Sequence, residues 1–163
     1  MDTAKKRERI ALFPGSFDPF TKGHAALVSS ALKLFDRVVV GVGCNISKSG
    51  LLEPEQRVRL IDDYYLDEPR VTSSIYRGMT VDFAREIGAV AMVRGIRNSM
   101  DLEMERTLEA VNSEIYPELQ TVMLLTPASV AHISSSCVRE LLAFGRDVSS
   151  MMPIGINIED YRE

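Results

Sequence analysis

A short stretch near the N-terminus combines the residue types that handle a phosphate group. Residues 15–24 (GSFDPFTKGH) lie between an apolar run at 10–13 and an amphipathic run at 25–35. That context predicts a strand, a tight turn and a helix. Such a junction places backbone N–H groups, the Ser16 hydroxyl and the His24 imidazole at the carboxyl edge of a parallel sheet, where anions bind. The stretch therefore predicts chemistry on a phosphate.

His24 has two interpretations from its position alone. A histidine at the start of a helix can make a purely structural hydrogen bond. Because Gly15 allows the chain to turn tightly and approach a ligand, and because His24 opens the helix after that turn, we favour an imidazole that points toward a bound anion.

Lys48 and a run of three serines are further candidates. Lys48 lies in a polar loop just past the second apolar run, where a solvated lysine and a ligand-binding lysine are equally compatible with the sequence. Ser134, Ser135 and Ser136 precede a helical pattern that begins at Cys137. Serines in that position cap a helix, bind an anion at its N-terminus, or do both through different side chains.

Two arginines follow the fourth apolar run. Arg94 is expected at the end of a buried strand, where its charge needs a partner. A phosphate is the natural bidentate partner of a guanidinium, and the alternative is an ion pair with Asp101, Glu103 or Glu105 on the next helix. We favour the phosphate for Arg94, whereas both interpretations stay open for Arg97.

Alternating strand and helix patterns must position these side chains. Short apolar runs at 10–13, 38–42, 71–75, 89–93 and 121–125 predict buried parallel strands. Helical patterns cover 23–35, 54–65, 80–87, 101–115 and 135–144, and a short last helix is expected after Pro153. This alternation predicts an α/β fold, a single doubly wound domain over residues 1–163 with a five-stranded parallel sheet. The candidate residues then converge on one edge of the sheet.

Composition narrows the class of function. The net charge of −4 argues against a broad nucleic-acid surface, and no apolar run approaches the length of a membrane span. The two cysteines, Cys44 and Cys137, match no metal or redox spacing, which favours buried thiols and a reducing cytoplasm. No cluster resembles a protein metal cage, so any Mg²⁺ is expected to arrive with nucleotide phosphates.

Together these motifs resemble the nucleotidylyltransferase superfamily. Its hallmarks match residues 15–24 and the Ile-Ser-Ser-Ser element at 133–136. Within it, the order and spacing of the motifs to about Pro153 are similar to the bacterial phosphopantetheine adenylyltransferase family, in which Thr21 replaces the first histidine of the His-x-Gly-His variant. Met104 and Val130 stand where aromatic residues are expected, and Ser16 replaces the commoner threonine.

The resemblance implies that the adenylyl group of ATP passes to 4'-phosphopantetheine, giving dephospho-coenzyme A and pyrophosphate by direct in-line attack. It also implies a Rossmann-like fold, Mg²⁺ bound with ATP, a homohexamer, and no nucleic-acid or membrane partner. Whether coenzyme A also binds is left open by the sequence.

The resemblance also implies roles for single residues. His24 stabilises charge on the α-phosphate, Ser16 and Lys48 orient the attacking phosphate, and Arg94 contacts the acceptor. The ATP-binding residues it implies are Ser16, Phe17, His24, Arg97, Glu105, Ser134, Ser135 and Ser136. The residues implied to line the pantetheine arm, besides Ser16, Lys48 and Arg94, are Gly78, Met79, Thr80 and Asn112.

Two other functions remain as alternatives. Another nucleotidylyltransferase of this superfamily, such as one that uses nicotinamide mononucleotide, would share most of these motifs. A nucleotide-binding regulatory module that transfers nothing would share the fold, although the presence of Ser16, His24, Lys48 and Arg94 together argues against it.

Overall fold

The computed structural model describes residues 7–45 and 49–162 of the chain. Five strands form one sheet in which every neighbouring pair is parallel, in the order β3-β2-β1-β4-β5. The strands are β1 (Ile10–Gly15), β2 (Arg37–Gly43), β3 (Val71–Tyr76), β4 (Ala91–Ile96) and β5 (Gln120–Leu125). The predicted α/β class with a five-stranded parallel sheet is confirmed.

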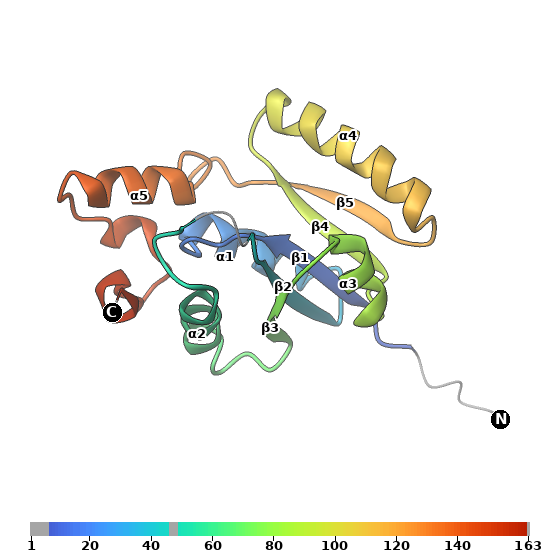
Figure 1. Ribbon diagram of the computed structural model, residues 1–163, viewed down its shortest axis with the longest axis horizontal. Helices are drawn as coiled ribbons and strands as arrows, with labels where there is room; N and C mark the ends of the chain where they lie inside the picture. The colour runs from blue at the N-terminus through green and yellow to red at the C-terminus, as the bar shows by residue number, and fades with distance from the viewer. Residues whose placement is uncertain (1–6, 46–48, 163) are drawn as a thin grey trace.

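Helices follow the strands around this sheet, with α4 at the margin of the molecule beside β4 and β5 (Figure 1). The helices are α1 (Lys22–Ala31), α2 (Pro54–Tyr64), α3 (Thr80–Glu86), α4 (Ser99–Ile115) and α5 (Ser135–Ala143). Two 3₁₀ helices, Ser149–Met151 and Ile158–Tyr161, lie near the C-terminus. The second of them corresponds to the short last helix expected after Pro153.

Alternate residues of β1 enter two different cores. Ala11 and Phe13 belong to a larger core that also receives buried side chains of α1, α2 and α5. Leu12 belongs to a second core with Val81 and Phe83 of α3. Because side chains alternate across a strand, this division shows that helices cover both faces of the sheet.

The order of the strands creates the place where a ligand can bind. The chain winds from β1 toward β2 and β3 on one side of the sheet, and places β4 and β5 on the other side. At such a switch point the carboxyl ends of the two central strands border a crevice. Here those ends are Gly15 of β1 and Ile96 of β4.

The fourth strand differs from its predicted position. Gly88, which follows the end of α3, has a φ of +69°, and the Ala89 amide still donates to that helix, at 2.9 Å from the Ala84 carbonyl oxygen. The strand therefore begins at Ala91 and not at residue 89, and it continues to Ile96. The prediction that Arg94 ends the strand is wrong, because this residue lies within β4.

Two helix ends also differ from the predicted positions. α4 begins at Ser99, two residues early, because the Asn98 side chain accepts a hydrogen bond from the Asp101 amide and caps the helix there. α1 ends at Ala31 and not at residue 35, and the chain continues through a turn. Within the part of the chain that the structure describes, no helix has the length and apolar character needed to cross a bilayer.

Candidate phosphate-binding site

The turn between β1 and α1 exposes one hydroxyl above a buried aromatic layer. Ser16 is exposed, whereas the next residue, Phe17, is only 3% exposed. Phe17 has a φ of +49°, a left-handed conformation that side-chain-bearing residues rarely adopt. Its ring packs against Phe13 and Phe20, with centroid separations of 5.2 and 5.5 Å. Gly15 leaves room for that ring, since a Cβ there would lie 2.9 Å from it.

His24 uses one ring nitrogen to cap its own helix. Its Nδ1 accepts a hydrogen bond from the Thr21 amide at 2.9 Å and lies 3.1 Å from the Thr21 hydroxyl. A neutral imidazole that accepts at Nδ1 carries its proton on Nε2. The structural interpretation of His24 is therefore correct for Nδ1, and the Nε2–H group remains as a donor.

Aromatic neighbours keep this imidazole uncharged. The rings of Phe17 and Phe20 lie 5.0 and 5.4 Å from it, centroid to centroid. Burial, and secondarily the positive charge of Arg97, lowers the pKa of His24 to about 4. Near pH 7 the side chain is therefore a neutral hydrogen-bond donor with a fixed tautomer.

Arg94 forms a bidentate ion pair with a carboxylate of α4. Its Nε and Nη2 donate to Glu105 at 2.8 and 2.7 Å, and its Nη1 donates to the Pro14 oxygen at 3.0 Å. The ion pair that we considered as the alternative for Arg94 is thus present. Its binding to a phosphate stays a prediction, and so does the binding of ATP by Glu105.

Arg97 is paired in a similar way with the start of α4. Its Nε donates to the Asp101 carboxylate at 3.0 Å. The hydrogen bond from Arg97 lowers the pKa of Asp101, so this carboxylate stays charged. Both arginines near the edge of the sheet are therefore held by acidic residues of α4.

The three serines have three different contacts. The Ser134 hydroxyl caps α5 by accepting from the Cys137 amide at 3.1 Å. The Ser135 hydroxyl donates to the Pro19 oxygen at 2.8 Å, and the Ser136 hydroxyl lies 3.1 Å from that of Ser134. Capping is confirmed for Ser134.

A cavity of about 340 Å³ opens above these groups at the edge of the sheet. It is lined by β1, the β1–α1 turn, α1, β4, α4 and the start of α5. The predicted nucleotide-binding residues that line it are Ser16, Phe17, His24, Arg97, Glu105, Ser134 and Ser135. Ser136 is not among its lining residues.

A second cavity of about 450 Å³ adjoins the first. It extends between β3, α3 and α4, and Met79, Met92 and Leu108 give it an apolar wall. The predicted acceptor-side residues that line it are Ser16, Gly78, Met79, Thr80, Arg94 and Asn112. Ser16, Arg94 and Glu105 line both cavities, so the two spaces meet at these side chains.

The remaining predictions concern Lys48, the two cysteines and metal binding. Lys48 lies outside the described residues. Cys44 and Cys137 are free thiols, but both are half-buried, so the prediction of buried thiols is wrong in degree. Among residues 7–45 and 49–162, no group of three or more His, Cys, Asp or Glu side chains is arranged to hold a metal ion.

Sequence reasoning also missed residues at the site. The Tyr76 hydroxyl lies 2.8 Å from that of Thr80 in the second cavity, and the position of Tyr76 at the carboxyl end of β3 could have indicated it. Asp18 and Arg57 form a buried ion pair that joins the β1–α1 turn to α2. Their separation of 39 positions in the sequence gives no local signal for the pair.

Comparison with known proteins identifies clear relatives. A model of the cytidylyltransferase-like family matches residues 12–141. A phosphopantetheine adenylyltransferase of Porphyromonas gingivalis is 46% identical over 94% of this chain and 99% of its own length. The enzyme of that name from Leuconostoc citreum is 47% identical over 85% of this chain and 87% of its own.

Solved structures share the fold at lower identity. A putative nicotinate-nucleotide adenylyltransferase from Vibrio parahaemolyticus superposes with a TM-score of 0.65 at 22% identity, covering 90% of this chain and 94% of that one. A bifunctional NMN adenylyltransferase/ADP ribose pyrophosphatase from Francisella tularensis, in complex with AMP and a manganese ion, superposes with a TM-score of 0.69 at 16% identity. That match covers 92% of this chain and 46% of the Francisella chain.

Proposed function

The chain belongs to the cytidylyltransferase-like family and, within it, to the phosphopantetheine adenylyltransferases, and we propose that the two adjoining cavities are its active site. It transfers the adenylyl group of ATP to 4'-phosphopantetheine, giving dephospho-coenzyme A and pyrophosphate in coenzyme A biosynthesis. The observation that supports this site most strongly is the meeting of the cavities at Ser16 and Arg94. One cavity takes the nucleotide and the other takes the acceptor.

The reaction needs no nucleophile from the protein. A phosphate oxygen of 4'-phosphopantetheine attacks the α-phosphorus of ATP. The new phosphorus–oxygen bond forms as the bond from the α-phosphorus to the bridging oxygen breaks, and pyrophosphate leaves with that electron pair. Positioning of the two phosphates and stabilisation of charge then carry the catalysis.

His24 is suited to stabilise the reacting phosphate. Its Nε2–H group is the free donor of a neutral ring whose orientation is fixed by Thr21. A donor that is held in place before the reaction needs no energy to reorient when negative charge builds on the α-phosphate. We assign that role to His24, with Phe17, Arg97, Glu105 and the segment Ser134–Ser136 around the nucleotide.

Arg94 can bind the acceptor phosphate without leaving Glu105. A guanidinium has five N–H groups, and the bonds to Glu105 and Pro14 use three of them. The remaining two belong to Nη1 and Nη2, so both nitrogens keep a donor for a phosphate oxygen. Glu105 then orients Arg94. Ser16 and Lys48 complete the phosphate contacts, and Gly78, Met79, Thr80 and Asn112 line the path of the pantetheine arm.

The metal in this proposal is part of the nucleotide substrate. We propose that Mg²⁺ enters bound to the phosphates of ATP, because the described residues offer no cluster of acidic, His or Cys side chains for an ion of their own. We also propose that the protein acts in the cytoplasm.

We propose a homohexamer, and the exposed face of α4 supports the association of one copy of the chain with another. None of the described residues of α4 is fully buried, although the helix carries several large apolar side chains. Those more than one third exposed are Met100, Leu102, Met104, Leu108, Val111 and Ile115. A second copy of the chain would remove this apolar surface from water.

Coenzyme A, which contains the product's pantetheine arm, is proposed as a further ligand of the two active-site cavities.

An acceptor comparison tests the proposed function. Purified protein receives ATP and Mg²⁺ with either 4'-phosphopantetheine or nicotinamide mononucleotide, and pyrophosphate release is measured. We expect turnover with 4'-phosphopantetheine alone. Turnover with nicotinamide mononucleotide instead would indicate the other adenylyltransferase class, and no turnover with either acceptor would indicate a regulatory module.

A further inference from the structure

A buried ion pair joins Asp18, in the turn that carries Ser16, to Arg57 of α2. Asp18 is 6% exposed and Arg57 of α2 is 8% exposed. The Arg57 Nε lies 3.5 Å from Asp18 Oδ1. Neither residue lines the two cavities of the proposed active site, so their charges do not serve as direct ligands there.

The Asp18 carboxylate holds the chain that leads into α2. Its Oδ2 accepts from the Leu51 amide at 2.9 Å, and its Oδ1 accepts from the Leu52 amide at 2.8 Å. Two consecutive amides thus bind the two oxygens of one carboxylate. The main chain packs closely against the pair at Gly50, because a Cβ there would lie 2.6 Å from Asp18 Oδ2 and would also overlap Arg57 Nη2.

The Arg57 guanidinium joins the same segment to the turn. Its Nε and Nη2 donate to the Leu52 oxygen at 2.9 and 2.7 Å. Its Nη1 donates to the main-chain carbonyl oxygen of Ser16 at 3.1 Å. One rigid plane therefore sets the distance between the main chain of Ser16 and the main chain of Leu52.

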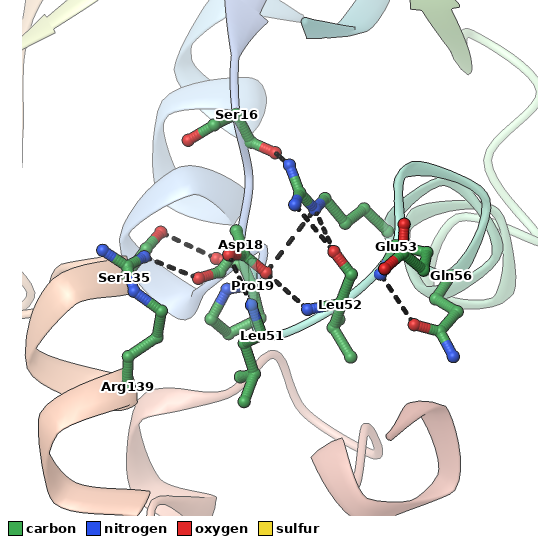
Figure 2. Close-up of polar contacts among 10 residues, drawn as sticks. Ser16, Asp18, Pro19, Leu51, Leu52, Glu53, Gln56, Ser135 and Arg139 are labelled. Atoms are coloured by element: carbon green, nitrogen blue, oxygen red, sulfur yellow. Dashed lines mark hydrogen bonds and ion pairs between the residues drawn. The ribbon is translucent and has the colours of Figure 1, made fainter. Parts of the chain in front are cut away.

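Helix α5 contacts the turn from its other side. The Arg139 Nη1 donates to the main-chain carbonyl oxygen of Asp18 at 2.7 Å, and the Ser135 hydroxyl donates to the carbonyl oxygen of Pro19 (Figure 2). The turn is thus hydrogen-bonded to α2, to the segment before α2 and to α5. Its centre is Phe17, whose left-handed φ of +49° is a strained conformation. Such strain persists only where surrounding contacts hold it.

We propose that Asp18 and Arg57 are positioning residues for adenylyl transfer, and that they hold the strained turn so that the Ser16 hydroxyl faces the junction of the two cavities. This inference rests on the proposed function. Stability alone is a weaker reason for the pair, since a buried ion pair is often no more stabilising than apolar residues of the same volume. The pair acts on catalysis through the main chain of Ser16.

Arg57→Lys is the informative substitution. Lysine keeps the positive charge but cannot hold the Ser16 and Leu52 oxygens with one planar group. We expect kcat/KM for 4'-phosphopantetheine to fall about 100-fold, the loss typical of a reacting group displaced by about 1 Å. The Kd for ATP should change less than about threefold, because most of the proposed ATP contacts are not made by the turn. Asp18→Asn, which is nearly isosteric, should show the same division.

Two further variants separate positioning from stability. Leu60→Ala removes a fully buried apolar side chain from the same helix. It should lower Tm at least as much as Arg57→Lys and leave kcat/KM unchanged. In the double variant Asp18→Asn/Arg57→Lys the loss should be close to the larger single loss, since the two residues act as one unit.

The outcomes distinguish this inference from the function on which it rests. An active wild type whose Arg57→Lys variant loses Tm but keeps kcat/KM would show that the pair is only structural. Equal losses of ATP affinity and of kcat/KM would place the effect on the whole cleft, and would also overturn the proposal. A wild type that is inactive with 4'-phosphopantetheine would overturn the proposed function itself.

Discussion

At the scale of single residues, His24 combines two tasks in one ring. Its Nδ1 belongs to the cap of α1, where the Thr21 amide donates to it at 2.9 Å, and the residue also lines the first cavity. The sequence suggested these tasks as alternatives, because the position of the residue does not show that the two nitrogens are used separately. The hydrogen bond from the Thr21 amide sets the tautomer that the proposed role of His24 requires.

Removing the ring should therefore affect the transition state more than the ground state. We expect His24→Ala to lower kcat by about 10² to 10³, the usual loss for one preorganised donor to a developing charge. The Kd for ATP should change far less, as measured by isothermal titration calorimetry. His132→Ala is the matched control, since His132 is exposed in the loop before α5. An unchanged kcat combined with a large loss of ATP affinity would contradict the role of His24.

The pKa of about 4 for His24 also predicts how stability depends on pH. The unfolded chain takes up a proton near pH 6.5, but the folded chain does so only near pH 4. Acid therefore favours the unfolded state across this window, and up to about 3 kcal/mol of stability present above pH 6.5 is lost as the pH falls to 4. Denaturant unfolding at pH 7 and pH 4.5 should show a smaller difference for His24→Gln than for the wild type. An equal difference for both proteins would mean that His24 is not held neutral.

At the scale of elements, the strands of the sheet were predictable from the sequence, whereas the ion pairs of Arg94 and of Arg57 were not. All five strands appear as short apolar runs, so their existence follows from local composition. The predicted start of β4 was too early because Ala89 is apolar and buried like a strand residue. The amide of Ala89 in fact donates to the last turn of α3. The ion pairs of Arg94 and of Arg57 depend on how β4 and α4, or α2 and the turn, lie in space. No periodicity within one segment encodes such contacts.

The N-terminal cap of α1 provides a test at this scale. Thr21 is fully buried, and its hydroxyl lies near both the amide and the Nδ1 of His24. Thr21→Val keeps the shape but removes the hydroxyl, so we expect a loss of about 1 to 2 kcal/mol in the free energy of unfolding. Thr21→Ser should lose less, because it retains the hydroxyl. Urea unfolding of both variants measures the difference, and equal losses would show that the cap contributes little.

At the scale of the whole molecule, α4 is the element whose exposure one copy of the chain does not explain. Val111 is 51% exposed on this helix and does not line either active-site cavity. If α4 packs between copies, Val111→Asp would bury a charge in the interface, and the assembly should dissociate into smaller species. Leu66→Asp is the control, because Leu66 is 82% exposed at a site remote in sequence from α4.

Sedimentation velocity measures this prediction. The wild type and Leu66→Asp should sediment as a species of six chains, and Val111→Asp as a smaller species. A wild-type monomer would contradict the proposed assembly.

The exposure of α4 was not predictable from its sequence, since its apolar residues have the spacing of a helix that packs on its own sheet.

The central claim is that ATP and the acceptor react directly with one another where the two cavities meet. The most direct measurement is the stereochemical course at the α-phosphorus, followed with an ATP analogue made chiral there by a sulfur substituent. One in-line displacement predicts inversion of configuration in the dephospho-coenzyme A product. Retention would require two displacements through a covalent intermediate on the protein, and would contradict the account.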